Sequence, residues 1–124
     1  MQDAPTPDEI LETVAKLMRE TLMPELSGRP AYLARVAANA LDLVRRQIQL
    51  EPAADSTERE RLTALLGKEG SLADLNRALC EAIESHAVGS GTPGLAEHLW
   101  ATAVEKVAVD QPNYAAYKRA IHKD

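Results

Sequence analysis

Residues 29–51, with the sequence RPAYLARVAANALDLVRRQIQLE, decide the fold because they hold the longest helical repeat in the chain. Apolar side chains recur there at the spacing of one face of an α-helix. They are Leu33, Val36, Ala37, Ala40, Leu41, Val44 and Ile48. The opposite side carries a polar stripe of Arg35, Asn39, Asp42 and Arg46, flanked by Ala31, Ala34 and Ala38. Because alanine is too small to hold another helix away, we predict a central helix that other helices pack against from several directions.

The composition favours an all-helical domain with an aliphatic core. The 124 residues suit a single domain, and a domain of that size buries roughly two-thirds of the surface of its unfolded chain. Hydrophobic residues make up 45% and charged residues 27%, which argues against disorder. The chain has no Phe, one Trp and three Tyr. The core must therefore be aliphatic and rich in alanine, which favours helices over sheets.

Charge and hydropathy narrow the classes of partner. The formal net charge is −5, and basic residues alternate with acidic ones, whereas a nucleic-acid-binding protein needs clustered Lys and Arg. We therefore expect no nucleic acid. No segment has the ~20 apolar residues that span a bilayer, and the N-terminus lacks a basic, apolar leader. We expect no membrane and a cytoplasmic location, which the lone Cys80 also fits.

Proline, glycine and capping residues divide the rest of the chain into five further predicted helices. They cover residues 7–23, 58–66, 72–87, 93–109 and 112–121. Trp100 belongs to a broad apolar arc of the helix at 93–109, and Tyr114 is expected to face inward from the last helix. Thr6 with Glu9, and Ser71 with Asp74, have the spacing of capping boxes, and Asp110 is placed to cap the last helix. Pro52 is expected to end the central helix, and residues 53–57 form a predicted linker. The short helix 58–66 should cover the edge of the bundle rather than build its core.

These patterns predict an all-α fold. It is a single-domain bundle, residues 1–124, of five to six helices around a central helix at about residues 30–50. Residues 1–5 are expected to be flexible.

Motifs for phosphate, metal and covalent chemistry are weak. Gly89, Gly91 and Gly94 match G-x-G-x-x-G, but a helix precedes them rather than the strand of a dinucleotide fold, so we interpret them as a loop. No two histidines have a metal-ligand spacing, and the Glu-x-x-His pairs of di-iron bundles are absent. We expect no metal and no cofactor. Cys80 is interpreted as a buried small hydrophobe rather than a nucleophile.

Six polar side chains allow two interpretations. They are Arg35, Asn39, Asn76, Arg77, Lys106 and Tyr114. In the first, they make core-organising hydrogen bonds or carry solvated charges, because a buried amide without partners costs about 1–3 kcal/mol. In the second, they converge on one polar cleft between helices, and such clefts bind small ligands. The sequence leaves both open.

Three stretches carry a resemblance to a known family. They are LSGRPAYLARVAANAL at residues 26–41, LADLNRALCEAI at 72–83 and VAVDQPNYAAYKRAI at 107–121. With the N-terminal helix, these stretches resemble a bacterial family of small all-helical proteins of unknown function. Its genes often stand beside those of an aminoglycoside-phosphotransferase-like kinase and an acyl-CoA dehydrogenase. The resemblance implies an accessory role in acyl-group or small-molecule metabolism, although gene neighbourhood is an association and not a mechanism.

Three functions are then compatible with the sequence. The first is a non-enzymatic accessory or protein-interaction protein that docks on the kinase-like phosphotransferase or the acyl-CoA dehydrogenase. An exposed apolar patch rimmed by polar residues would indicate this function. The alternative is a bundle that binds an anionic or acyl small molecule in the cleft. An enzyme of unknown reaction comes third, since spacing alone places no nucleophile and base. A homodimer also suits so alanine-rich a bundle.

Overall fold

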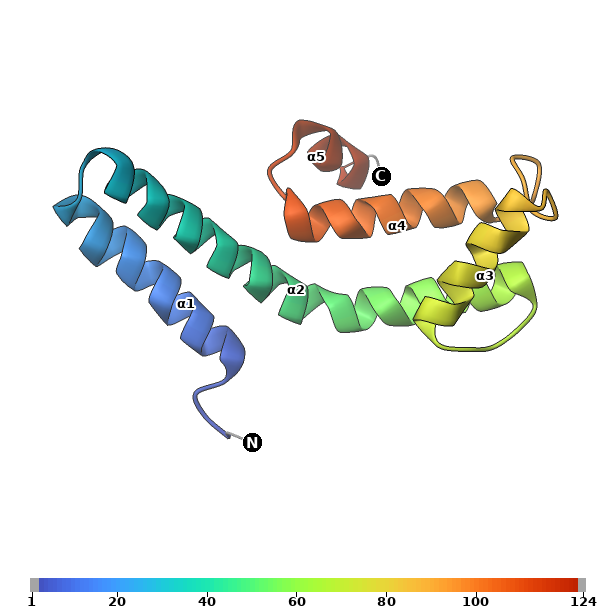
Figure 1. The fold of residues 1–124 in the computed structure, drawn as a ribbon, viewed down its shortest axis with the longest axis horizontal. Coiled ribbons are helices and arrows are strands. Elements are labelled where there is room, and N and C mark those ends of the chain that lie inside the picture. Colours follow the sequence, from blue (N-terminus) through green and yellow to red (C-terminus); the bar gives the residue numbers. More distant parts are fainter. Residues whose placement is uncertain (1–2, 123–124) are drawn as a thin grey trace. The chain divides into compact units, whose positions relative to one another are not determined.

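A computed structural model describes residues 3–122 (Figure 1). It contains five α-helices, and no strand occurs among the described residues. The helices are α1 (Pro7–Leu17), α2 (Gly28–Leu66), α3 (Leu72–Glu84), α4 (Leu95–Asp110) and α5 (Ala115–Ile121). A π-helical turn, η1 (Met18–Leu22), and a 3₁₀ turn, η2 (Met23–Glu25), follow α1. The predicted all-α class is confirmed. Part of the segment predicted to be flexible, residues 1–2, lies outside the described residues.

The chain divides into two compact units, one up to Glu51 and one from Pro52. We call them the N-terminal unit and the C-terminal unit and describe each by itself. Whether the two units form the predicted single domain depends on how they fit together, so the single-domain organisation stays a prediction.

The predicted linker at residues 53–57 is wrong, because α2 runs without interruption from Gly28 to Leu66. Pro52 was expected to end the central helix, but it lies inside α2. Proline removes one backbone N–H from a helix, so the carbonyl of Ile48 cannot receive the usual hydrogen bond. The other bonds of the helix and its side-chain contacts must offset this cost.

The N-terminal unit is a hairpin of α1 and the first part of α2 (Figure 1, blue to green). Thr6 caps α1 as predicted: its hydroxyl accepts from the Glu9 N–H, and the Glu9 carboxylate accepts from the Thr6 N–H. The buried residues of this unit are Ala15, Ala34 and Ala38. The predicted role of the small alanines is therefore confirmed, since two helices that meet through alanines can approach closely.

Charged pairs hold the same hairpin along its polar side. Arg19 donates to the Asn39 amide oxygen at 2.9 Å and forms an ion pair with Asp42 at 2.7 Å. Near the start of α1, Arg45 donates two hydrogen bonds to the Asp8 carboxylate. These bonds lower the pKa of the Asp8 carboxyl. Leu33, Val36, Val44 and Ile48 do not pack inside the hairpin but remain exposed, which corrects the predicted packing face; Leu41 is half-buried.

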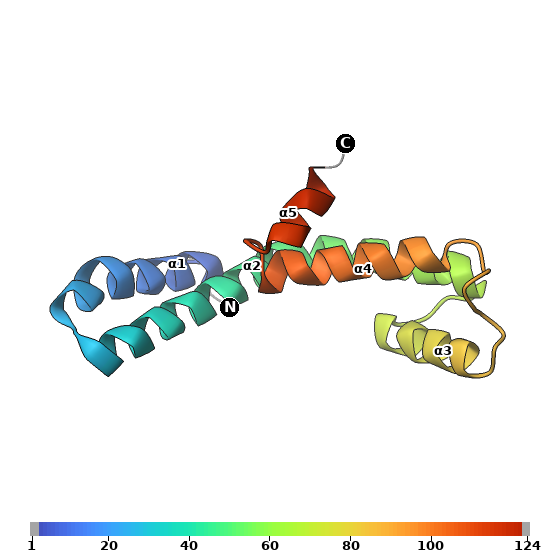
Figure 2. The ribbon, with the colours of Figure 1, turned by 90° about the horizontal axis from the view of Figure 1, so that it is seen from above.

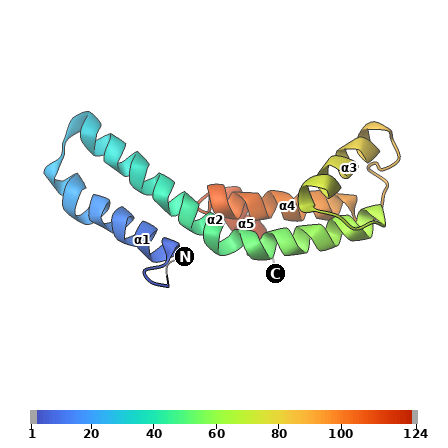
Figure 3. The same ribbon diagram turned by 60° about the horizontal axis from the view of Figure 1, so that its bottom comes forward.

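The C-terminal unit consists of the second part of α2 with α3, α4 and α5 (Figure 2, green to red). Its core is a cluster of Leu62, Leu75, Leu79 and Leu95. Leu62 is fully buried. The segment 58–66 therefore builds the core, and the prediction that it covers an edge is wrong. Figure 3 shows α4 alongside this part of α2, with α3 at the far end.

Three helix ends differ from their predicted positions. The α3 helix stops at Glu84, because His86 adopts a left-handed conformation with φ of 62°. The α4 helix begins at Leu95 after Gly94, whose φ is 87°, and the G-x-G-x-x-G glycines lie in the predicted loop. Asp110 is the last residue of α4 and does not cap the last helix. The N-cap residue of α5 is Tyr114. Ser71 caps α3 as predicted, accepting from the Asp74 N–H.

A hydropathy search of the described helices finds none that is both long enough and apolar enough to cross a membrane.

Candidate functional site

Two of the six predicted site residues, Arg35 and Asn39, lie in the N-terminal unit. Both are exposed on α2, one helical turn apart. Asn39 accepts a hydrogen bond from Arg19, so its amide contributes to the contact between α1 and α2. For Asn39, this hydrogen bond agrees with the first of the two interpretations, in which the polar side chains organise the packing.

The other four predicted residues lie in the C-terminal unit, where no hydrogen bond joins any two of them within the described residues. Asn76 donates to the Glu58 carboxylate at 2.8 Å and to the Leu72 carbonyl at 3.2 Å. Arg77 pairs with Asp74 on the exposed side of α3. Lys106 is exposed on α4, and Tyr114 lines a groove described below. A cleft that gathers all six residues stays a prediction.

A polar cluster that the sequence analysis did not single out connects α2 with α4. Arg61 donates to both oxygens of the Glu105 carboxylate, at 3.0 and 2.7 Å. Thr102 and Thr57 complete the cluster through hydrogen bonds at 3.3 Å to Arg61 and Glu105, respectively. Each of the two charged side chains is about one-quarter exposed. The bond to Glu105 raises the pKa of the Arg61 guanidinium, so Arg61 keeps its positive charge.

His98 lies beside this cluster on α4 and is only 3% exposed. No group among the described residues forms a hydrogen bond with its Nδ1, nor with Nε of Arg61. Burial lowers the pKa of the imidazole, and the positive charge of Arg61 lowers it further, against the opposing effect of Glu58 and Glu105. The imidazole is therefore neutral at pH 7. A side chain this deeply buried does not meet a dissolved substrate, so we assign the cluster to holding the helices together.

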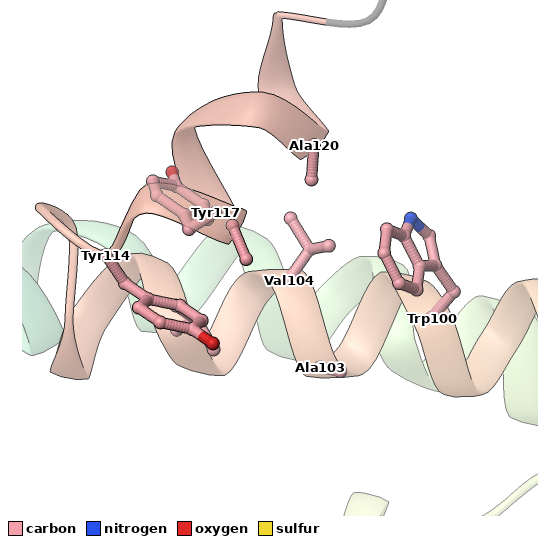
Figure 4. Close-up of a pocket in the computed structure, with 8 residues that line it drawn as sticks. Trp100, Ala103, Val104, Tyr114, Tyr117 and Ala120 are labelled. Carbon is pink, nitrogen blue, oxygen red and sulfur yellow. The ribbon is translucent and has the colours of Figure 1, made fainter.

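An apolar groove between α4 and α5 is the most distinctive surface feature of the C-terminal unit (Figure 4). It has a volume of about 160 Å³. Trp100 stands at one end beside Ala120, with Tyr114 and Tyr117 beyond Val104. The lining residues are Trp100, Ala103, Val104, Val107, Tyr114, Ala116, Tyr117 and Ala120. We call this surface the aromatic groove.

The aromatic groove leaves large side chains accessible to solvent. Trp100 is 65% exposed and Tyr114 is 57% exposed, so the predicted inward orientation of Tyr114 is wrong. A second hollow shares Trp100, Ala116 and Ala120 with the groove, and Arg119 is its charged lining residue. The groove thus combines aromatic surface with a basic edge.

A search of residues 3–122 finds no group of three or more His, Cys, Asp or Glu side chains that could hold a metal ion. Cys80 is exposed on α3 rather than buried, which corrects its interpretation as a core residue.

A comparison with protein families matches residues 24–114 to a model described as Domain of unknown function (DUF6285). The chain belongs to this family. The segment that matches DUF6285 contains the whole of α2, α3 and α4, with the Arg61–Glu105 pair, His98 and Trp100. The helices α1 and α5 lie outside it. Neither the curated proteins nor the solved structures contain a match.

Sequence reasoning missed the Arg61–Glu105 pair because the two residues lie 44 positions apart in the chain, on different helices. The continuity of α2 was the missing signal. With a linker placed at residues 53–57, Arg61 belongs to a marginal edge helix and its partner cannot be foreseen. Trp100 was assigned to the apolar arc of its helix, and nothing in the spacing distinguishes a buried arc from an exposed one.

Proposed function

We propose that this protein is a non-enzymatic accessory protein that binds a partner protein through the aromatic groove. The observation that carries the proposal is the exposure of Trp100 and Tyr114 beside a groove between α4 and α5. Tryptophan and tyrosine are the residues that most often dominate the binding energy of protein interfaces. An apolar side chain of a partner that enters the groove would remove both rings from water.

The charge around the aromatic groove favours an acidic partner segment. The last turn of α5 carries Lys118 and Arg119, and no described residue forms an ion pair with either. Opposite charges at the rim of an interface accelerate association and select the partner. The partner surface therefore presents an apolar side chain flanked by carboxylates.

The partner we propose is the aminoglycoside-phosphotransferase-like kinase that the family resemblance implies. Gene neighbourhood supports this choice only as an association, and the acyl-CoA dehydrogenase is the second enzyme to test. Each enzyme is co-expressed with the tagged full chain, and the recovered complex is quantified after affinity purification. A complex with the kinase-like enzyme is the expected result.

Two variants make the experiment specific for the aromatic groove. Trp100→Ser should weaken the complex at least tenfold, because truncating an interface hot spot costs about 2 kcal/mol or more. Ile83→Ser is the matched control, since Ile83 is an exposed apolar residue on α3 of the same unit. If neither enzyme is retained, or if both variants weaken the complex equally, the proposed docking surface is wrong. Retention of the dehydrogenase alone overturns the choice of partner.

A second candidate function is the binding of an anionic, chain-like small molecule in the same groove. The observation that favours it is the hollow that continues from Trp100 to Arg119, where an acidic head group could lie while an alkyl chain occupies the groove. Fluorescence of Trp100 tests this function directly, because it is the only tryptophan in the chain. A blue shift on addition of a fatty acid, lost in Arg119→Gln, supports the ligand. Unchanged emission excludes it.

A further inference from the structure

The N-terminal unit buries no large apolar side chain. Among its described residues, those below the surface are Ala15, Ala34 and Ala38. Large apolar side chains of both helices are instead 39–49% exposed, namely Ile10, Val14, Leu17, Leu33, Val36, Val44 and Ile48. The fully buried side chains of the two helices are thus alanines, and a buried alanine contributes far less than a buried leucine. The hairpin therefore needs another surface against its apolar side chains.

Six apolar positions of α2 are symmetric about a point between Ala40 and Leu41, whereas Val36 has Arg45 at its mirror position. The positions are residues 33, 37, 40, 41, 44 and 48. Reversing the direction of the helix exchanges Leu33 with Ile48, residue 37 with residue 44, and Ala40 with Leu41. An antiparallel copy of the same helix therefore matches these six positions in every layer. Large side chains then meet at both ends, while a small side chain faces a larger one at each inner position.

From this symmetry we propose that the surface covering the hairpin is the hairpin of a second copy of this chain. The two copies of α2 pack antiparallel about a two-fold axis beside Ala40, and the apolar residues of α1 extend the contact on both sides. Such an interface is isologous, which means that the same residues of both copies form it and each contact occurs twice. The result is a four-helix arrangement in which the apolar face of each hairpin becomes core.

Charges at the two ends of the pattern agree with the antiparallel direction. Arg29 lies at the start of α2 and Glu51 at the end of the same apolar stripe, and both are exposed. In the antiparallel pair, Arg29 of one copy lies next to Glu51 of the other. A parallel pair would place each of these charges beside its own copy, which is unfavourable.

The first test is the mass of the full chain in solution, measured by light scattering during size-exclusion chromatography over a dilution series. The proposal predicts twice the 13.5 kDa of one chain. Ala40→Glu places an unpaired charge at the axis and should raise the dissociation constant about 100-fold or more. Ala53→Glu makes the same substitution at an exposed position of α2 outside the hairpin and should leave the dimer intact. A monomeric wild-type chain, or a dimer insensitive to Ala40→Glu, overturns the proposal.

The second test fixes the direction of the pair and does not depend on the folding of Ala40→Glu. In a Cys80→Ser background, chains carrying Leu33→Cys are mixed with chains carrying Ile48→Cys and mildly oxidised. The proposal predicts that the disulfide joins one chain of each kind. Cross-linking of Leu33→Cys chains to each other, or no cross-link at all, contradicts the antiparallel pair. Both tests are independent of the aromatic groove and of its partner.

Discussion

The guanidinium of Arg61 on α2 donates to both carboxylate oxygens of Glu105 on α4, at 3.0 and 2.7 Å. Parallel N–H bonds to the two oxygens of one carboxylate are the strongest form of charged hydrogen bond in proteins. This pair therefore fixes the position of α4, which carries Trp100 of the aromatic groove, against α2.

The first prediction concerns that pair. Glu105→Gln should lower the free energy of unfolding by about 1–3 kcal/mol, because it leaves a partly buried guanidinium without its carboxylate. Urea unfolding followed by far-UV circular dichroism measures the change. Arg77→Gln is the matched control, since it removes an ion pair whose two side chains are mostly exposed, and it should have little effect. Equal effects of the two variants would show that the Arg61–Glu105 pair is only a surface contact.

The second prediction concerns pH. Burial holds the pKa of His98 below its ordinary value of 6.5 in the folded protein, so the unfolded chain binds the proton more readily. Stability from this residue is therefore fully present above about pH 6.5 and falls as the pH drops toward the folded pKa. The slope is at most about 1.4 kcal/mol per pH unit for one proton.

His98→Gln should remove this slope between pH 7.5 and the folded pKa, whereas His122→Gln at the exposed end of α5 should leave it unchanged. Urea unfolding at a series of pH values provides the comparison. A slope that survives in His98→Gln would assign the pH dependence to other groups.

The third prediction separates the glycines of the G-x-G-x-x-G stretch. Gly94 has φ of 87°, and a Cβ there would lie 3.4 Å from Leu65 Cδ2. Gly94→Ala should therefore destabilise the protein by about 1 kcal/mol or more, because alanine rarely adopts a left-handed conformation. Gly91→Ala should be nearly neutral, since a Cβ there meets open space. If both substitutions were neutral for stability, the structural role of Gly94 would be wrong.

The fourth prediction tests the core of the C-terminal unit. Leu62 is fully buried against Leu75 and Leu79, so Leu62→Ala should cost about 2–5 kcal/mol. Leu99→Ala removes the same atoms from a half-exposed position on α4 and should cost much less. Thermal unfolding of both variants decides whether residues 58–66 build the core or only cover it.

Several features of the fold could be predicted because they depend on neighbouring residues. The capping box at Thr6, the N-cap at Ser71 and the alanine contact of α2 are local patterns, and the structure confirms them. The course of α2 through Pro52 could not be predicted, because its local cost is offset by contacts with distant segments.

The candidate site was less accessible to sequence reasoning. A helical period shows which side chains share a face, but not whether another element covers that face. Trp100 and Val44 belong to equally clear apolar arcs, as Leu62 does, yet both are exposed and Leu62 is buried. Whether such a face is buried or exposed depends on where its packing partner lies, in the same chain or in another protein.

The most direct measurement of the central claim is the ¹⁹F resonance of 5-fluorotryptophan at position 100, the only tryptophan in the chain. The labelled protein is titrated with the unlabelled kinase-like enzyme. Docking through the aromatic groove predicts a second, shifted resonance that grows in proportion to the complex and reaches saturation. A complex that forms while the resonance of residue 100 remains unchanged would contradict the account.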